Sequence, residues 1–491
     1  MLGVQAGGPA AELRRAALLT VVIGQFAVQL ASMPISAILP TLADAFQADF
    51  ALISWVSGAY LLTLTGFLLV GGRLGDLYGH RRTYMVGIAI YSIAGGLGGV
   101  APDALLLIVL RGLQGFGAAL MSGNSLAIIA NAFPGGERGR AVGVVQIAAA
   151  LGGVVGLLYS TLFLDALSWQ WLFWVLWPIG LLGLWSARKL DEARLPGGHV
   201  PVARPDVVGA VLLFLTLVVG SLSLNHLHGG ERSFQEGAFY HTTMQALALL
   251  LLGAFIFAER RVAQPLIRFA DLRNRDFNAL AVCNTIMHMT MMASIFTMPF
   301  LLERALHLPK AYTGALLTVL QLTWVFLAYL SGYLYDRYRA TWLVPLGMAL
   351  IGLGLLGWGL LAPLGYGVIM AAALVMGVGT GLYMTANNTL AIGLMPGSRR
   401  GLASGLLETT RQLGHSFGVA IASTMMGAAV ADALSGVGSA TGFLVGFQQV
   451  SLAMAAVCGV GLGLSLLPLL PRGPSTSRPA ATPAPLAGAR Q

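Results

Sequence analysis

The sequence predicts an all-helical membrane protein with fourteen spans, built from two homologous six-helix halves with two further helices between them. Of its 491 residues, 57% are hydrophobic and only 10% are charged, whereas soluble domains carry about 25% charged residues. Apolar runs recur along the whole chain, and each is close to the roughly 20 residues that a helix needs to cross the hydrocarbon core of a bilayer. The two halves also repeat each other in sequence, which is the third observation behind this fold class.

Charged residues, glycines and prolines separate the apolar runs into fourteen expected helices. The first run is followed by many others and has no small-residue cleavage site, so we expect a helix there rather than a removable signal peptide. The expected helices cover residues 16–39, 51–71, 83–101, 104–131, 140–163, 170–188, 206–226, 241–259, 277–302, 312–334, 341–362, 365–394, 401–430 and 447–470.

Basic residues indicate how these helices are oriented. If the N-terminus is cytoplasmic, 23 of the 28 Lys and Arg residues fall in cytoplasmic segments, three fall on the opposite side, and Arg111 and Arg411 fall inside the membrane. By the positive-inside rule, both termini are expected in the cytoplasm and the chain in the cytoplasmic (inner) membrane of a bacterium. The net charge of +9 follows from this topology, so no nucleic-acid partner is expected.

The chain repeats itself at a shift of about 260 residues. A shift of 260 places Gly72, Leu74 and Asp76 on Gly332, Leu334 and Asp336, and a shift of 262 places Gly115 and Gly117 on Gly377 and Gly379. The repeat predicts a cytoplasmic N-terminus (1–15), a first six-helix bundle (16–190), two inserted helices (206–262), a second bundle (277–470) and a disordered tail (471–491). Two repeated six-helix bundles are a transporter architecture.

An enzyme is not expected. The sequence has no GxSxG or Walker pattern and no His, Cys and carboxylate cluster that would suggest a catalytic metal. Both cysteines, Cys283 and Cys458, lie inside apolar runs. We therefore expect no metal and no cofactor.

The stretch "GGRLGDLYGHRR" (71–82) resembles the loop motif of the major facilitator superfamily, in which Gly-x-Leu-x-Asp-x-x-Gly precedes basic residues. "LIVLRGLQGFGAA" (107–119) resembles the family's helix-4 motif. The fourteen spans, "SWVSGAYLLTLTGFLLVGGRLGD" and "RQLGHSFGVAI" are similar to the drug:proton antiporter branch. The resemblance implies a major-facilitator fold and a monomeric secondary transporter.

The sequence departs from that branch in three helices; in the helix-6 entry, Gln170 and Leu176 stand where the branch has an arginine and an asparagine, and the other two departures bear on proton coupling. Ala31 stands where the helix-1 signature has an acid, and Gly156-Leu157 replaces the Gly-Pro of the helix-5 motif. The two departures leave open whether transport is coupled to protons.

The loop motif and its repeat are expected to form a conformational latch. A carboxylate at the end of one helix is stabilised by the N-terminus of a neighbouring helix, glycines permit a tight turn, and arginines pair with the carboxylate or with anionic lipid head groups. A basic turn that only fixes topology is the alternative. The latch residues are Gly72, Asp76, Gly79, Arg81, Arg82, Gly332, Asp336 and Arg337.

Four polar residues at membrane depth are candidates for proton coupling, since such residues usually face a cavity or a partner. Glu408 and Arg411 share one face of the helix at 401–430, and their relation leaves two alternatives: a protonatable carboxylate or a structural ion pair. Arg111 is the third candidate, and His288 is the fourth because imidazole titrates near neutral pH. Structural arginine and packing histidine are the respective alternatives.

Polar and aromatic side chains in other helices are candidates for a substrate cavity. The methionines around His288 fit varied apolar shapes or simply fill space. The cavity candidates are Gln25, Gln29, Gln114, Asn124, Gln146, Asn284, Gln321, Trp324, Asn387, Asn388, Gln412 and His415.

The function expected from these observations is efflux of hydrophobic or amphipathic small molecules, driven by proton influx and performed by rocking the two bundles about a midplane site. Its expected partners are the substrate, protons and membrane lipids. The alternatives are a lipid or metabolite exporter of the same fold, an uncoupled facilitator or importer, and a membrane sensor that no longer transports.

Overall fold

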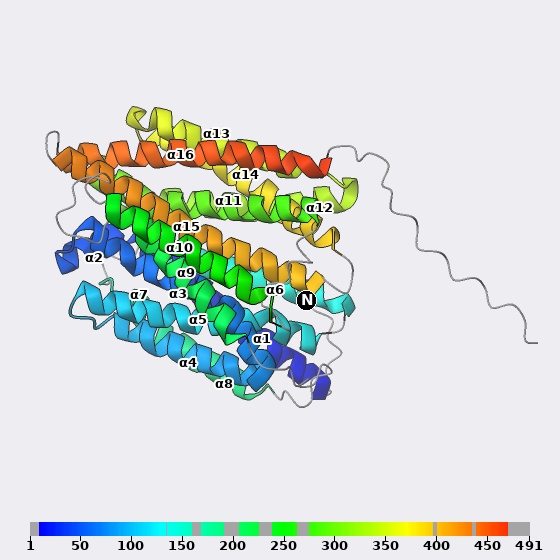
Figure 1. The fold of residues 1–491 in the computed structure, drawn as a ribbon. Coiled ribbons are helices and arrows are strands. Elements are labelled where there is room, and N and C mark those ends of the chain that lie inside the picture. The colour runs from blue at the N-terminus through cyan, green and yellow to red at the C-terminus, as the bar shows by residue number, and fades with distance from the viewer. Residues whose placement is uncertain are drawn as a thin grey trace, which may run out of the picture.

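The computed structural model describes residues 9–133, 135–159, 168–190, 206–224, 238–262, 274–395, 400–434 and 438–469, and helices form all the regular structure in them (Figure 1). The α-helices are α1 (Pro9–Ala37), α2 (Leu39–Phe46), α3 (Phe50–Tyr78), α4 (His80–Gly98), α5 (Ala104–Ala132), α6 (Gly135–Leu158), α7 (Trp171–Trp174), α8 (Leu176–Arg188), α9 (Val207–Leu224), α10 (Ala238–Glu259), α11 (Arg275–Pro299), α12 (Lys310–Tyr338), α13 (Leu343–Leu361), α14 (Tyr366–Gly393), α15 (Arg400–Leu434) and α16 (Ser439–Leu466). Shorter turns are the π-helix η4 (Phe300–Ala305) and the 3₁₀ helices η5 (Ala362–Leu364) and η7 (Leu467–Leu469).

Eleven helical segments in the described ranges are long and apolar enough to cross a membrane. They comprise α1, α3, α5, α6, α10, α11 with η4, and α12 to α16. Three other helices coincide with expected spans: α4, α8 and α9, the last with a shorter apolar core at Val211–Gly220. The all-helical prediction is confirmed, while the exact count of fourteen spans stays a prediction.

Two expected helices differ in detail from the structure. The segment 170–188 is interrupted at Val175 and forms α7 and α8. Pro178 explains the interruption, because a proline has no N–H for the carbonyl four residues earlier and its ring crowds that carbonyl. The segment 277–302 continues three residues further than expected, since α11 runs into η4.

Side-chain caps explain where several helices begin. The Asp49 carboxylate accepts a hydrogen bond from the Leu52 backbone N–H at 2.8 Å, and Asp103 accepts one from Leu106 at 2.8 Å. Such caps satisfy N–H groups that have no partner inside the helix. They begin α3 and α5 at the same end of the bundle.

The two halves of the chain pack in matching patterns. In the first half α3 and α4 pack on α5, and α6 and α8 pack on α1; in the second half α12 and α13 pack on α14, and α15 and α16 pack on α11. The close approaches also match. A Cβ atom at Gly117 would lie 2.6 Å from the Tyr91 backbone nitrogen, and one at Gly379 would lie 2.8 Å from the Ile351 backbone nitrogen. Glycine permits these backbone contacts because it has no side chain. The domain boundaries themselves stay a prediction.

The two inserted helices, α9 and α10, pack on each other, and α9 also contacts α3 and α15. Figure 1 shows them (green) beside α15 (orange) and α3 (blue). The Phe214 ring of α9 lies 4.4 Å from the Phe67 ring of α3, and a Cβ atom at Gly66 would lie 2.5 Å from Phe214. Because α3 and α15 belong to different halves, α9 covers a boundary between the halves.

The glycine contacts lead to a prediction about stability. We expect Gly117→Val to lower the free energy of unfolding by about 1–3 kcal/mol, since the added carbon atoms must separate α4 from α5. Melting of the detergent-solubilised protein measures the effect. Gly253→Val in α10 is the control, because a Cβ atom there would meet nothing within 4 Å. Equal melting temperatures for both variants would contradict the close-packing role.

Candidate functional site

The turn between α3 and α4 is built around two glycines. Gly79 has a φ of 96°, a conformation that favours glycine, and its N–H donates to the Gly75 carbonyl at 2.9 Å. A Cβ atom at Gly75 would lie 1.6 Å from the Asn124 Oδ1 atom. The space is needed because Asn124 Oδ1 bonds His80 Nδ1 at 2.8 Å, while Asn124 Nδ2 donates to the Gly71 carbonyl at 2.7 Å. Asn124, expected to line a substrate cavity, therefore ties α5 to this turn.

Asp76 forms its ion pairs within the first half. Its carboxylate lies 3.5 Å from Arg73 and 3.7 Å from His80. Arg81 instead donates to the Ala187 and Arg188 carbonyls, both at 3.0 Å, at the C-terminus of α8, and Arg82 is exposed. Arg73 and His80 were not among the predicted latch residues, although the i,i+3 and i,i+4 spacing from Asp76 could have identified them.

The repeat of this motif at the end of α12 is not a copy of the turn. Arg339, which the shift of 260 places on Gly79, has a φ of 50°, so a non-glycine residue occupies the left-handed conformation. Gly332 is partly buried and Arg337 is exposed. The side chain of Asp336 lies outside the described part of the structure. The two turns therefore differ in the residue that closes them.

A cavity of about 250 Å³ separates the two halves next to Asp76. Its walls come from α3 and α5 of the first half and from α15 of the second. Arg73 and Asp76 lie on one wall and Glu408 and Thr409 on the other. We call this space the inter-half cavity; it brings a latch residue and a proton-coupling candidate to the same space.

Glu408 is paired in this structure. Its Oε1 atom accepts hydrogen bonds from Arg411 at 2.5 Å and from Gln412 Nε2 at 3.0 Å. A carboxylate that accepts two such bonds is stabilised in its ionised form. Glu408 is therefore ion-paired with Arg411 in this conformation, and its role in proton coupling stays a prediction. Glu408 lines the inter-half cavity, and Arg411 pairs with it from the next turn of α15.

Several polar atoms next to this pair have no hydrogen-bond partner. They are Arg411 Nε, Gln412 Oε1 and His415 Nε2. The His415 ring lies 5.2 Å from that of His288, whose Nδ1 bonds the Asn284 carbonyl at 2.9 Å. The two histidines thus bring α11 and α15 together, and Asn284 Nδ2 strengthens this contact by donating to the Leu407 carbonyl at 2.9 Å.

Arg111 forms a separate buried site inside the first half. Its Nε donates to the Val56 carbonyl at 3.0 Å, one terminal nitrogen donates to Gln114 at 2.6 Å, and the guanidinium lies 4.2 Å from the centre of the Tyr60 ring. No carboxylate pairs with it among the described residues. Backbone, amide and aromatic groups stabilise this charge.

The remaining cavity candidates do not gather in one place. Gln25 donates to Ser125 Oγ at 3.0 Å and so joins α1 to α5. Gln29 is half-buried and Gln146 is exposed. Asn387 and Asn388 each have a buried side-chain oxygen without a partner. Gln321 and Trp324 line a different pocket, inside the second half.

At the end of the bundle opposite to the α3–α4 turn, the halves are in contact. Arg304 in η4 forms an ion pair with Asp44 in α2 and donates to the Pro40 carbonyl at 3.0 Å. The Phe50 ring of α3 packs against Phe300 at 4.8 Å and Phe296 at 5.9 Å. The halves therefore meet at this end and enclose a cavity at the other, which is the geometry of a transporter open to one side.

Sequence comparison agrees with this geometry. The profile described as Major Facilitator Superfamily matches residues 21–419 and 280–490, and the chain belongs to this family. It is 31% identical over 428 residues to the uncharacterized transporter YebQ of Escherichia coli strain K12, covering 86% of this chain and 91% of that protein.

Relatives with named substrates are similar over most of their length. The riboflavin transporter RibZ of Clostridioides difficile strain 630 is 26% identical over 458 residues, covering 91% of this chain and 96% of RibZ. The tetracenomycin C resistance and export protein of Streptomyces glaucescens is 27% identical over 420 residues, covering 84% of this chain and 76% of that protein.

A solved structure shows the same fold. A bacterial homologue of the human lysosomal transporter Spinster, in an inward-facing and unoccupied conformation, superposes with a TM-score of 0.65 at 15% identity, covering 95% of this chain and 97% of that one. The chain is thus a multi-pass membrane transporter of the Major Facilitator Superfamily and not an enzyme.

The contacts at the closed end lead to a prediction about transport. In the double variant Asp44→Cys/Arg304→Cys, a short bis-methanethiosulfonate linker should stop flux, because it joins the halves where they must separate. Reduction of the linker should restore flux, measured with Nile red in proteoliposomes. Arg14→Cys/Glu137→Cys is the control, since this ion pair at 3.2 Å lies within the first half. Full flux after cross-linking of the Asp44/Arg304 variant would contradict the prediction.

Proposed function

We propose that the protein exports hydrophobic or amphipathic small molecules by alternating access, coupled to proton influx. One observation carries the proposal: Glu408 of the second half, which is paired with Arg411, lines the same cavity as Asp76 of the first half. A charged pair on the wall between two moving halves is exposed to different surroundings as they rock. Protonation of Glu408 would break its pairing with Arg411, and the halves would then favour a different arrangement.

The relatives support export of small molecules. Several of them are named as multidrug or antibiotic exporters, among them the tetracenomycin C export protein. RibZ is named for riboflavin, so a metabolite is the second candidate cargo. The missing acid at Ala31 and the missing proline at Leu157 favour the uncoupled alternative. Nile red flux measured with and without a pH gradient distinguishes coupled from uncoupled transport.

The proposal includes the arrangement in the membrane. We place α4, α8 and α9 across the bilayer with the eleven apolar helical segments, which gives fourteen spans. The end with the α3–α4 turn would then face the cytoplasm, together with both termini, in the inner membrane of a bacterium. The matching packing of the two halves supports a first bundle at 16–190 and a second at 277–470. We further propose that the monomer is the working unit.

Asp76 is the proposed latch that closes the cytoplasmic side when α15 approaches it. We expect Asp76→Ala to slow Nile red efflux about tenfold, which corresponds to about 1.4 kcal/mol in the barrier, because the closed state loses its carboxylate. Asp76→Glu should restore much of the rate. Efflux from everted membrane vesicles measures both. A normal rate for Asp76→Ala at wild-type expression would refute the latch.

Glu408 is the proposed site of proton coupling. Glu408→Gln keeps the shape and an acceptor oxygen but cannot change charge, so we expect a pH gradient no longer to accelerate Nile red flux. Exchange of Nile red without a gradient should persist. Glu137→Gln, at an exposed carboxylate of the first half, is the matched control. Gradient-driven flux that survives in Glu408→Gln would show that the coupling site lies elsewhere.

A further inference from the structure

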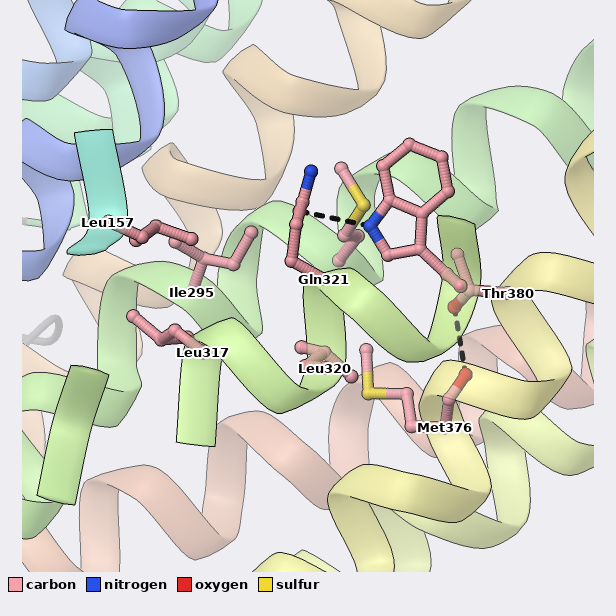
Figure 2. Close-up of a pocket in the computed structure, with 9 residues that line it drawn as sticks. Leu157, Ile295, Leu317, Leu320, Gln321, Met376 and Thr380 are labelled. Carbon is pink, nitrogen blue, oxygen red and sulfur yellow. Dashed lines mark hydrogen bonds between the residues drawn. The ribbon is translucent and has the colours of Figure 1, made fainter. Parts of the chain in front are cut away.

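A second, smaller pocket lies inside the second half, next to its contact with the first. Its walls come from α11, α12 and α14, and Leu157 of α6 closes it from the first half (Figure 2). We call it the Gln321 pocket. Its lining includes Leu157, Met291, Gln321, Trp324, Met376 and Thr380. None of the residues that line it is charged.

The orientation of the Gln321 amide is determined by its neighbour. Trp324 Nε1 donates to Gln321 Oε1 at 2.9 Å (Figure 2). Because an indole N–H can only donate, the amide oxygen must face Trp324 and the amide nitrogen must face away from it. Gln321 is 3% exposed, and its Nε2 atom has no partner. The pocket therefore holds a buried donor without an acceptor.

The other polar group of the pocket, the Thr380 hydroxyl, does not need a hydrogen-bond acceptor from a ligand. The Thr380 hydroxyl donates its proton to the Met376 carbonyl at 2.9 Å, so it is already satisfied. A buried donor without a partner keeps its full desolvation penalty, whereas a hydroxyl that donates does not. The strongest polar requirement of the pocket is thus an acceptor placed on Gln321 Nε2.

The apolar walls favour an aromatic ligand. Trp324 offers a ring for stacking, and the thioethers of Met291 and Met376 adapt to flat ring surfaces and attract them. With no charged wall residue, an ionised ligand would have to lose its hydration without compensation. Neutral rings are the class that these walls fit.

The pocket is closed in this conformation. Its free volume of about 10 Å³ has room for about one water molecule. Leu157 is the lining residue that comes from the first half, so rocking of the halves would withdraw it and enlarge the pocket. Binding of a ligand in the Gln321 pocket would therefore depend on the stage of the transport cycle.

We propose that the Gln321 pocket selects neutral aromatic substrates that carry a carbonyl oxygen, which accepts a hydrogen bond from Gln321 Nε2. This inference rests on the transport function proposed above and specifies its substrate class. Trp324 is the positioning residue, because it holds the amide with its nitrogen toward the ligand.

Three neutral tricyclic compounds of similar size test the proposal. Xanthone carries a carbonyl, xanthene lacks it, and carbazole offers an N–H donor instead. Each competes with Nile red for the full-length protein in nanodiscs, and empty nanodiscs give the lipid background. We expect xanthone to bind about tenfold more tightly than xanthene, and carbazole no more tightly than xanthene. Equal affinities for xanthone and xanthene would overturn the proposal. A water molecule bound to Gln321 Nε2 would produce that result.

Two variants separate selection by Gln321 from a general effect on folding. Gln321→Leu should remove the xanthone preference and leave xanthene binding unchanged. Trp324→Phe keeps a ring but frees the Gln321 amide to turn its oxygen toward the ligand. The affinity for carbazole, whose N–H donates, should then rise at least about fivefold. Gln448→Leu is the control, because this amide donates to the Gly359 carbonyl away from the pocket. A xanthone preference that persists in Gln321→Leu would overturn the assignment.

Failure of this inference and failure of the transport function give different results. If Nile red flux responds to a pH gradient but Gln321→Leu does not change the ratio of xanthone to xanthene affinity, the pocket assignment is wrong and the transport function stands. If the ratio depends on Gln321 but no gradient drives flux, the pocket assignment stands and proton-coupled export is wrong.

Discussion

The absence of water inside a bilayer is the constraint on which this structure depends. A polar group at that depth must find a partner in the protein or face a cavity. Asn124 shows the first outcome, because its amide bonds two backbone carbonyls and His80. Glu408 shows both, since it is paired with Arg411 and also lines the inter-half cavity. Gln321 Nε2 shows neither outcome, because it is buried without a partner, and it is there that we propose a ligand.

Much of the fold could be predicted because helices in a membrane depend on local composition. Apolar length predicts spans, and the repeat predicts that α3 with α5 and α12 with α14 pack alike, which is observed. The interruption at Val175 was not expected from the apolar pattern, although Pro178 signals it. Whether all fourteen expected helices cross the bilayer depends on three short or polar ones, for which composition alone is not decisive.

The candidate sites were harder to predict because partners depend on geometry between helices. The i,i+3 spacing left both an ion pair with Arg411 and a protonatable Glu408 open, and no local pattern places Glu408 opposite Asp76. Arg81 was expected near Asp76 and instead bonds the carbonyls at the end of α8. The orientation of the Gln321 amide depends on Trp324 one turn away, and no sequence motif encodes it.

The two halves share the same arrangement of helices but differ in the positions of their buried charged residues. The shift of 262 places Glu408 on Gln146 and Arg411 on Ala149, so the first half has neither charge at these positions. Among the described residues, the buried charge of the first half is Arg111 on α5, held by backbone and amide groups. The inserted α9 adds a second asymmetry, because it covers the boundary of α3 with α15 and, among the described residues, makes no comparable contact with α6 and α12. In the proposed rocking motion, α15 would move against α9, whereas α12 would separate from α6 and open the Gln321 pocket without displacing α9.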